Sequence, residues 1–161
     1  MNQTGTDMKQ QKSDASVVNV TMKLEVDVIP VSDVERSKQF YQRLGWRLDE
    51  DVSPAENVRA VQFTPPGSGR SVTFGNGLTA AAPGSATGAL IVSDIRAAHA
   101  EFSRRGIDAS EMWHGAPFPA EARLPGPDPK RTSYGSFFAF SDPDGNAWVV
   151  QEVTTRRPGR I

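Results

Sequence analysis

Val31-Ser32-Asp33-Val34 recurs 61 residues later as Val92-Ser93-Asp94-Ile95, so the chain repeats a short stretch of its own sequence. At the same offset, Gly45 meets Gly106. Further pairs match in the same way: Tyr41 with Phe102, Trp46 with Ile107, and Glu50 with Glu111. Agreement at one offset over about twenty residues indicates two copies of one supersecondary unit.

The first copy can be divided into elements by its pattern of apolar and polar residues. Residues 24–29 largely alternate between the two types, as a half-buried strand does. Ser32 or Asp33 then supplies the N-cap of a helix, and Gly45 is placed to end it. Further strands are predicted from residue 46, over residues 58–64 and over residues 71–74. The unit is therefore strand–helix–strand–strand–strand.

The second copy follows the same order. Its predicted elements are a strand over 88–92, a helix from 95 to about 105, and strands over 107–113, 136–140 and 147–153. The fold class is therefore α+β, built from two tandem βαβββ modules. The expected organisation is a flexible tail (1–20), a first module (21–77), a linker (78–86), a second module (87–155) with a long loop (114–133), and a C-terminal tail (156–161).

Composition excludes several classes of function. With 18 basic and 19 acidic side chains, the net charge of -1 argues against nucleic acid as the main partner, since phosphate binding needs a basic face. The absence of Cys excludes disulfides, thiolate nucleophiles and Cys-based metal sites. No apolar run reaches the ~18 residues of a membrane span, and the N-terminal residues lack the apolar core of a signal peptide. We therefore expect no membrane partner and, by default, a cytoplasmic location.

Three motifs resemble those of the vicinal oxygen chelate superfamily, which groups glyoxalases, bleomycin-resistance proteins and extradiol dioxygenases. They are Ile29-Pro30-Val31-Ser32-Asp33-Val34-Glu35-Arg36-Ser37, then Phe40-Tyr41 with Leu44-Gly45-Trp46, and Phe140-Ser141-Asp142-Pro143-Asp144-Gly145-Asn146. The resemblance covers about residues 22–155. It implies paired βαβββ modules whose mixed sheets curl around a cleft, commonly in a homodimer.

The resemblance also implies where a metal would be bound. In the enzymatic members, one His or Glu from the first and last strand of each module binds a divalent cation in the cleft. Carried over to this chain, three of these positions fall on Val26, Thr87 and Val149, and the fourth falls within residues 72–74. A divalent cation needs several oxygen or nitrogen donors at about 2.0–2.5 Å, which valine cannot supply. We expect no metal at the usual place, and no cofactor.

The cleft that the resemblance implies would instead be mostly apolar. We expect its lining to come from the first and last strands of the modules: Val26, Val28, Thr87, Ala89, Val149 and Gln151. An apolar lining with few polar groups suits a small hydrophobic or aromatic organic compound.

The loop over residues 114–133 is rich in proline, which argues against regular secondary structure there. Long loops in compact domains often act as lids over a site. Aromatic and cationic side chains in or beside the loop are suited to stacking on an organic ligand and orienting it. The expected ligand contacts are Trp113, His114, Phe118, Arg123 and Tyr134.

Three residues are candidates for proton transfer if the protein is an enzyme: His114, Asp27 and Tyr134. An imidazole near neutral pKa can act as a general base. Strand alternation with Val26 facing the cleft turns Asp27 toward the helix layer or a sheet edge, where an Arg or Lys would pair with it. The opposite parity would make it a desolvated proton abstractor. His99 is expected to pack beside the buried face of its helix.

The main functional prediction is a small-molecule-binding protein that holds its ligand without the usual metal and acts by sequestration. The alternative is a metal-independent lyase, isomerase or cyclase that uses a His or Asp general base. A structural or regulatory dimer with a collapsed cleft is a third possibility.

Overall fold

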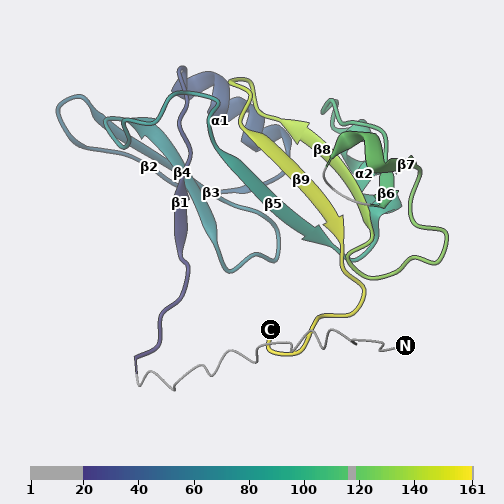
Figure 1. Cartoon of the computed structure of the whole chain (residues 1–161). Coiled ribbons are helices and arrows are strands. Elements are labelled where there is room, and N and C mark those ends of the chain that lie inside the picture. The colour runs from purple at the N-terminus through teal and green to yellow at the C-terminus, as the bar shows by residue number, and fades with distance from the viewer. Residues whose placement is uncertain (1–19, 116–118, 161) are drawn as a thin grey trace, which may run out of the picture.

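The computed structural model describes residues 20–115 and 119–160, whose strands form two sheets (Figure 1). In chain order the elements are β1 (Val26–Val28), α1 (Val34–Arg43), β2 (Arg47–Ala55), β3 (Val58–Thr64), β4 (Ser71–Asn76), β5 (Thr87–Val92), α2 (Ile95–Arg104), β6 (Trp113–Gly115), the 3-10 helix η1 (Ala120–Ala122), β7 (Arg123–Pro125), β8 (Ser136–Ser141) and β9 (Ala147–Glu152). The four-stranded sheet has the order β1-β4-β3-β2, and the five-stranded sheet has the order β5-β9-β8-β6-β7. The predicted α+β fold class is confirmed.

The internal repeat is visible in how the two helices begin and end. Asp33 caps α1 by accepting from Arg36 N at 3.0 Å, which decides between the two N-cap candidates. Asp94, its repeat mate, caps α2 in the same way. Gly45 and Gly106 follow the helices with φ of +80° and +70°, a conformation that glycine adopts without steric cost.

The repeat extends to the register of the sheets. In each module the first strand pairs in parallel with the last, β1 with β4 and β5 with β9. Val28 lies opposite Thr73, and Ala89 lies opposite Val149. Because Val28 and Ala89 are repeat mates, Thr73 occupies the position in the first module that Val149 occupies in the second.

Aromatic side chains form a core that both modules share. Tyr41 on α1 is fully buried, with its ring centroid 5.5 Å from that of Phe74. Trp46 of the first module meets Trp148 of the second edge to face, with centroids 5.5 Å apart. Aromatic pairs of this geometry contribute about 0.5–1.5 kcal/mol each beyond the area that they bury. The two modules are therefore joined through their interior.

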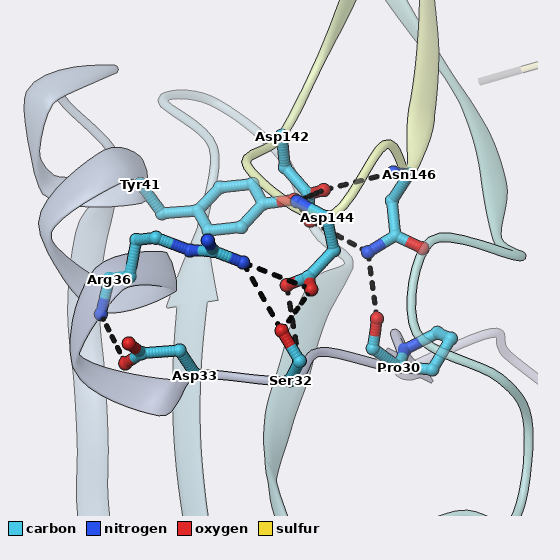
Figure 2. Close-up of polar contacts among 8 residues, drawn as sticks. All are labelled: Pro30, Ser32, Asp33, Arg36, Tyr41, Asp142, Asp144 and Asn146. Carbon is cyan, nitrogen blue, oxygen red and sulfur yellow. Dashed lines mark hydrogen bonds and ion pairs between the residues drawn. The ribbon is translucent and has the colours of Figure 1, made fainter.

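A buried polar cluster also joins the modules, at the turn between β8 and β9 (Figure 2). The hydroxyl of Tyr41 donates to Asp142 Oδ2 at 3.0 Å and accepts from Trp148 Nε1 at 3.2 Å. Asn146 Nδ2 donates to Pro30 O at 2.8 Å, so the turn is tied to the segment that precedes α1. Burial, and then the charge of Asp142, raises the pKa of Tyr41 well above its usual range.

The outer part of the same turn contacts the start of α1. Asp144 accepts from Ser32 N at 3.2 Å and from Arg36 Nη2 at 3.1 Å (Figure 2). The Ser32 hydroxyl also donates to Asp144. Ser32 therefore serves the contact between the modules, while its neighbour Asp33 caps the helix.

Two sequence predictions in the second module were wrong. The strand expected over 107–113 is shorter and later, since β6 spans Trp113–Gly115 and Ala109 makes only an isolated bridge to Phe140. The hydroxyl of Ser110 accepts the Ala139 N–H at 2.9 Å, so a side chain replaces part of the backbone ladder there. The proline-rich loop also contains regular structure, namely η1 and the edge strand β7. Its residue Phe118, like most of the N-terminal tail, lies outside the described residues.

In the part of the chain that the structure describes, no helix combines the length and the apolar character that crossing a membrane requires.

Candidate functional site

One face of the five-stranded sheet packs on α2, and the other is not covered by a helix of the described chain. Phe138 and Val150 are fully buried on the side of α2, where Phe138 contacts the Phe102 ring. Alternation along the strands turns their neighbours to the opposite side. This opposite side, called the open face below, carries Thr87, Ala89, Ile91, Trp113, Phe137, Val149 and Gln151.

The open face has an apolar hollow of about 450 Å³, called the apolar chamber. It is lined by Thr87, Gly88, Ala89, Trp113, Arg123, Phe137, Val149 and Gln151. Trp113 and Phe137 stack with ring centroids 5.6 Å apart and an interplanar angle of 17°. The Arg123 guanidinium carbon lies 4.0 Å from the Trp113 ring centroid, a cation–π distance. Both rings are almost fully buried, at 5% and 4% exposure, so they form an aromatic wall of the hollow through the small part of their surface that stays accessible.

A second hollow of about 550 Å³, called the arginine chamber, adjoins the first. It is lined by Ala89, Ile91, Gly115, Tyr134, Phe137, Gln151, Arg156, Arg157 and Arg160. Ala89, Phe137 and Gln151 line both chambers, so the two lie next to each other on the open face.

Tyr134 lies in a turn whose backbone is held from several sides. Its φ of +69° is unusual for a residue other than glycine. Tyr134 N donates to Glu152 O at 2.8 Å, and Gln151 Nε2 donates to Tyr134 O at 2.9 Å. These bonds fix the turn against the end of β9 and so define one side of the arginine chamber.

An ion pair beneath this turn anchors it to α2. Arg131 pairs with the fully buried Glu152 and lies 3.5 Å from Asp94, the N-cap of α2. The hydrogen bond from Arg131 lowers the pKa of Glu152, and the same contact raises the pKa of Arg131. Glu152 also accepts from Ile95 N at 2.8 Å. The guanidinium of Arg131 is therefore engaged with protein carboxylates.

A third hollow, of about 490 Å³, lies where β1 and β5 approach each other and is lined by Val28, Thr87 and Ala89 among others. Asp27 also lines it and forms an ion pair with Arg70. The pairing of Asp27 with an arginine is the structural role expected from strand alternation. Val26 is 42% exposed and lines none of the hollows described here.

Neither histidine reaches these chambers in the described structure. His114 follows Trp113 in β6, so its side chain points to the other face of the sheet, where Nδ1 lies 2.7 Å from Gly126 O. A carbonyl oxygen only accepts, so Nδ1 carries the proton in this contact. His99 Nε2 lies 2.9 Å from Ser110 O, and its ring meets Phe138 edge to face. His99 therefore lies beside the buried face of α2, as expected.

The structure brings most of the predicted ligand contacts together. Six of them line the apolar chamber: Thr87, Ala89, Trp113, Arg123, Val149 and Gln151. Tyr134 lines the adjoining arginine chamber, while Val28 lies in the hollow beside β1. The three candidates for proton transfer are separated, because Asp27, Tyr134 and His114 lie at three different places in the described structure.

The comparisons with known proteins agree with this architecture. The family model of the Glyoxalase/Bleomycin resistance protein/Dioxygenase superfamily matches residues 20–150. The chain belongs to this superfamily. No curated protein matches it significantly.

Solved structures of superfamily members share the fold. TnmS3, an antibiotic binding protein from Streptomyces sp. CB03234, is 27% identical with a TM-score of 0.63, and the match covers 85% of this chain and 99% of that one. A glyoxalase/bleomycin resistance protein from the same organism is 29% identical with a TM-score of 0.60, over 81% and 100% of the two chains. A superfamily member from Sphaerobacter thermophilus DSM 20745 is 26% identical with a TM-score of 0.61, over 82% and 98%.

The metal that the superfamily implies does not fit the donors of this member. The sheet register assigns its fourth ligand position to Thr73, whose hydroxyl donates to Val61 O at 3.2 Å. The other three positions are Val26, Thr87 and Val149, so neither a carboxylate nor an imidazole stands at any of the four. Among residues 20–115 and 119–160, no three His, Asp or Glu side chains are grouped so that they could hold a metal. Two threonine hydroxyls are poor ligands for a divalent cation.

Sequence reasoning missed several residues of the open face. Phe137 and Ile91 could have been found, because each shares strand parity with a residue that was predicted, Phe137 through pairing with Gln151 and Ile91 with Ala89. The C-terminal arginines carried no such signal, because their position depends on contacts with a turn about twenty residues earlier in the chain.

Proposed function

We propose that this superfamily member binds a small hydrophobic or aromatic organic compound on its open face, without the usual metal, and acts by sequestering it. The observation that carries the proposal is the apolar chamber, where the stacked Trp113 and Phe137 rings form one wall. Its volume of about 450 Å³ lies in the range of small-molecule sites. The similarity to an antibiotic binding protein supports the same class of function.

The three candidate residues for proton transfer lie apart from one another, which favours binding over catalysis. A general base must lie within hydrogen-bond reach of the proton that it removes. His114 points away from the open face, and Asp27 is held by Arg70 in a different hollow. Tyr134 is the one of these three that lines a chamber of the open face. A lyase, isomerase or cyclase that combines two of them is therefore less well supported.

Titration with 1-pyrenemethanol, a neutral planar fluorophore, tests the proposal. Ala89→Phe should fill the chamber where the ligand would lie, since Ala89 is exposed and borders all three hollows. Excluding about 80 Å² of apolar contact costs about 2 kcal/mol, so the dissociation constant should rise about 30-fold. Val52→Phe, on the exposed part of the other sheet, is the matched control and should bind as the wild type does. Equal affinity in all three proteins would place the ligand elsewhere.

Substitution of Trp113 separates stacking from hydrogen bonding. The indole N–H of Trp113 is buried and has no hydrogen-bond partner in the described structure. Trp113→Phe should therefore keep most of the affinity for 1-pyrenemethanol, because it keeps a ring beside Phe137. Trp113→Leu removes the ring and should weaken binding several-fold more than Trp113→Phe does. Indistinguishable affinities would contradict the role of the aromatic wall.

We also propose that two copies associate through the region around β1. Apolar side chains alternate there and remain exposed: Val20, Met22, Leu24, Val26 and Val28. Such a stripe, which runs along the edge strand β1 and the segment before it, is a liability unless another surface covers it. Light scattering during size exclusion should give a dimer, and Leu24→Glu should shift it toward the monomer.

A further inference from the structure

The C-terminal residues are held beside the open face by specific hydrogen bonds. Ser133 Oγ donates to Thr155 O at 2.8 Å and accepts from Thr154 N at 3.0 Å. Arg157 N then donates to the Tyr134 hydroxyl at 3.2 Å. The chain that follows β9 is thereby fixed to the same turn that bounds the arginine chamber.

This arrangement concentrates positive charge at one end of the open face. Arg156, Arg157 and Arg160 all line the arginine chamber. The Arg157 guanidinium carbon lies 4.9 Å from the Tyr134 ring centroid, which directs it over the ring. Within residues 20–115 and 119–160, none of the ion pairs involves these three arginines.

The nearest acidic side chain along the chain does not neutralise this charge. Glu152 is fully buried on the side of α2, and Arg131 already occupies it. Three guanidinium groups at one chamber repel one another, and an anion placed among them would relieve that repulsion. Guanidinium groups also match carboxylates with paired, charge-assisted hydrogen bonds.

We infer that the arginine chamber binds the carboxylate of an aromatic acid whose planar body lies in the apolar chamber. This inference rests on the proposed function, because it extends the same ligand from one chamber into the next. Ala89, Phe137 and Gln151 border both chambers, so the two hollows are neighbours on the open face and one molecule that reaches past these three side chains would occupy both. The aromatic wall binds the apolar body, and the arginines select the acid over neutral analogues.

A matched pair of probes isolates the charge: 1-pyrenecarboxylate and the neutral 1-pyrenemethanol. At low salt the wild type should bind the carboxylate about 10-fold more tightly. Changing Arg156, Arg157 and Arg160 together to Gln should reduce this preference below about 2-fold and leave the affinity for 1-pyrenemethanol unchanged. Each Gln retains its backbone N–H, so the bond to Tyr134 can persist.

A control variant removes the same number of charges outside both chambers: Arg47→Gln, Arg96→Gln and Arg104→Gln, on β2 and α2. It should keep the preference for the carboxylate. The inference is wrong if the wild type binds both probes equally, or if the chamber variant keeps the 10-fold preference. Those results leave the proposed function intact, whereas failure of both probes to bind the wild type contradicts the proposed function as well.

Discussion

Replacing Tyr41 with Phe should destabilise the protein far more than the same replacement at its other tyrosine, Tyr134. Tyr41 is fully buried, and its hydroxyl donates to Asp142 and accepts from Trp148. Without the hydroxyl, the indole N–H of Trp148 loses its acceptor inside the core. A buried group left unsatisfied costs about 1–3 kcal/mol.

The magnitude follows from what remains in the cluster. Asp142 keeps the bond from Asn146 Nδ2 at 2.7 Å, so its carboxylate is still partly satisfied. Tyr41→Phe should therefore lower the free energy of unfolding by about 2 kcal/mol, the cost of one orphaned donor and one weakened acceptor. For a domain of this size, that corresponds to a fall in melting temperature of about 4–8 °C. The hydroxyl of Tyr134 lies at the surface and accepts one bond from Arg157 N, so Tyr134→Phe should change stability by less than about 0.5 kcal/mol.

Urea unfolding followed by tryptophan fluorescence measures both variants. A double-mutant cycle identifies the partner, because Trp148→Phe removes the donor that Tyr41→Phe would leave unsatisfied. In the Trp148→Phe background, Tyr41→Phe should cost about 1 kcal/mol less than in the wild type. Equal destabilisation by the two tyrosine replacements, or strict additivity in the cycle, would refute the role assigned to this cluster.

Three further predictions concern backbone packing and pH. Gly75→Ala should cost about 3 kcal/mol or more in a thermal melt, because its Cβ would lie 1.7 Å from Arg59 O, whereas Gly69→Ala meets nothing within 4 Å and should be nearly neutral. Glu152→Gln should lower the free energy of unfolding by about 1–2 kcal/mol at pH 7, which is less than the loss of a fully buried ion pair because Arg131 is partly exposed. Folding lowers the pKa of Glu152, so the wild type should lose stability as the pH falls below about 4.5, and the variant should lose less. Folding raises the pKa of Tyr41, so above about pH 10 the unfolded state releases a proton that the folded state keeps. In unfolding measured over a series of alkaline pH values, the stability of the wild type should therefore fall relative to that of Tyr41→Phe by about 1.4 kcal/mol per pH unit.

Much of the fold could be predicted because the sequence contains two copies of the same structural unit. The repeat located both helices, and β3 spans the predicted residues 58–64. The strand expected over residues 107–113 was wrong because a side chain forms one of the hydrogen bonds that the backbone of a strand would form. Ser110 N donates to Ala139 O, but the return bond from Ala139 N goes to the Ser110 hydroxyl, and an alternation pattern cannot show that substitution. The hydrogen bond between Ser32 and Asp144 could not be predicted either, because the two residues are 112 positions apart in the sequence.

The candidate site was predictable to the extent that strand parity decides it. Val149 and Gln151 share a face with Ala89 because β5 and β9 pair in register, and all three line the apolar chamber. Parity also explains why His114 does not reach the open face, because it follows Trp113 in β6 and its side chain therefore points to the opposite side of the sheet. The arginine chamber depends instead on how the chain after β9 docks on the turn at Tyr134, and no local pattern encodes that docking.

The same strands support the fold with one face and present the open face with the other. This explains how a member of this superfamily can have valine and threonine at the family's ligand positions and keep its architecture. On β9, Trp148 and Val150 are buried in the core, while Val149 between them contributes to the chamber. Val149 is only partly buried, so a substitution there removes less packing than truncation at Val150, which would leave a cavity and cost a few kcal/mol. The usual ligand position therefore lies where a side chain can change at a smaller cost to stability than in the core. Selection on the ligand can act there while the aromatic core and the Tyr41 cluster hold the modules together.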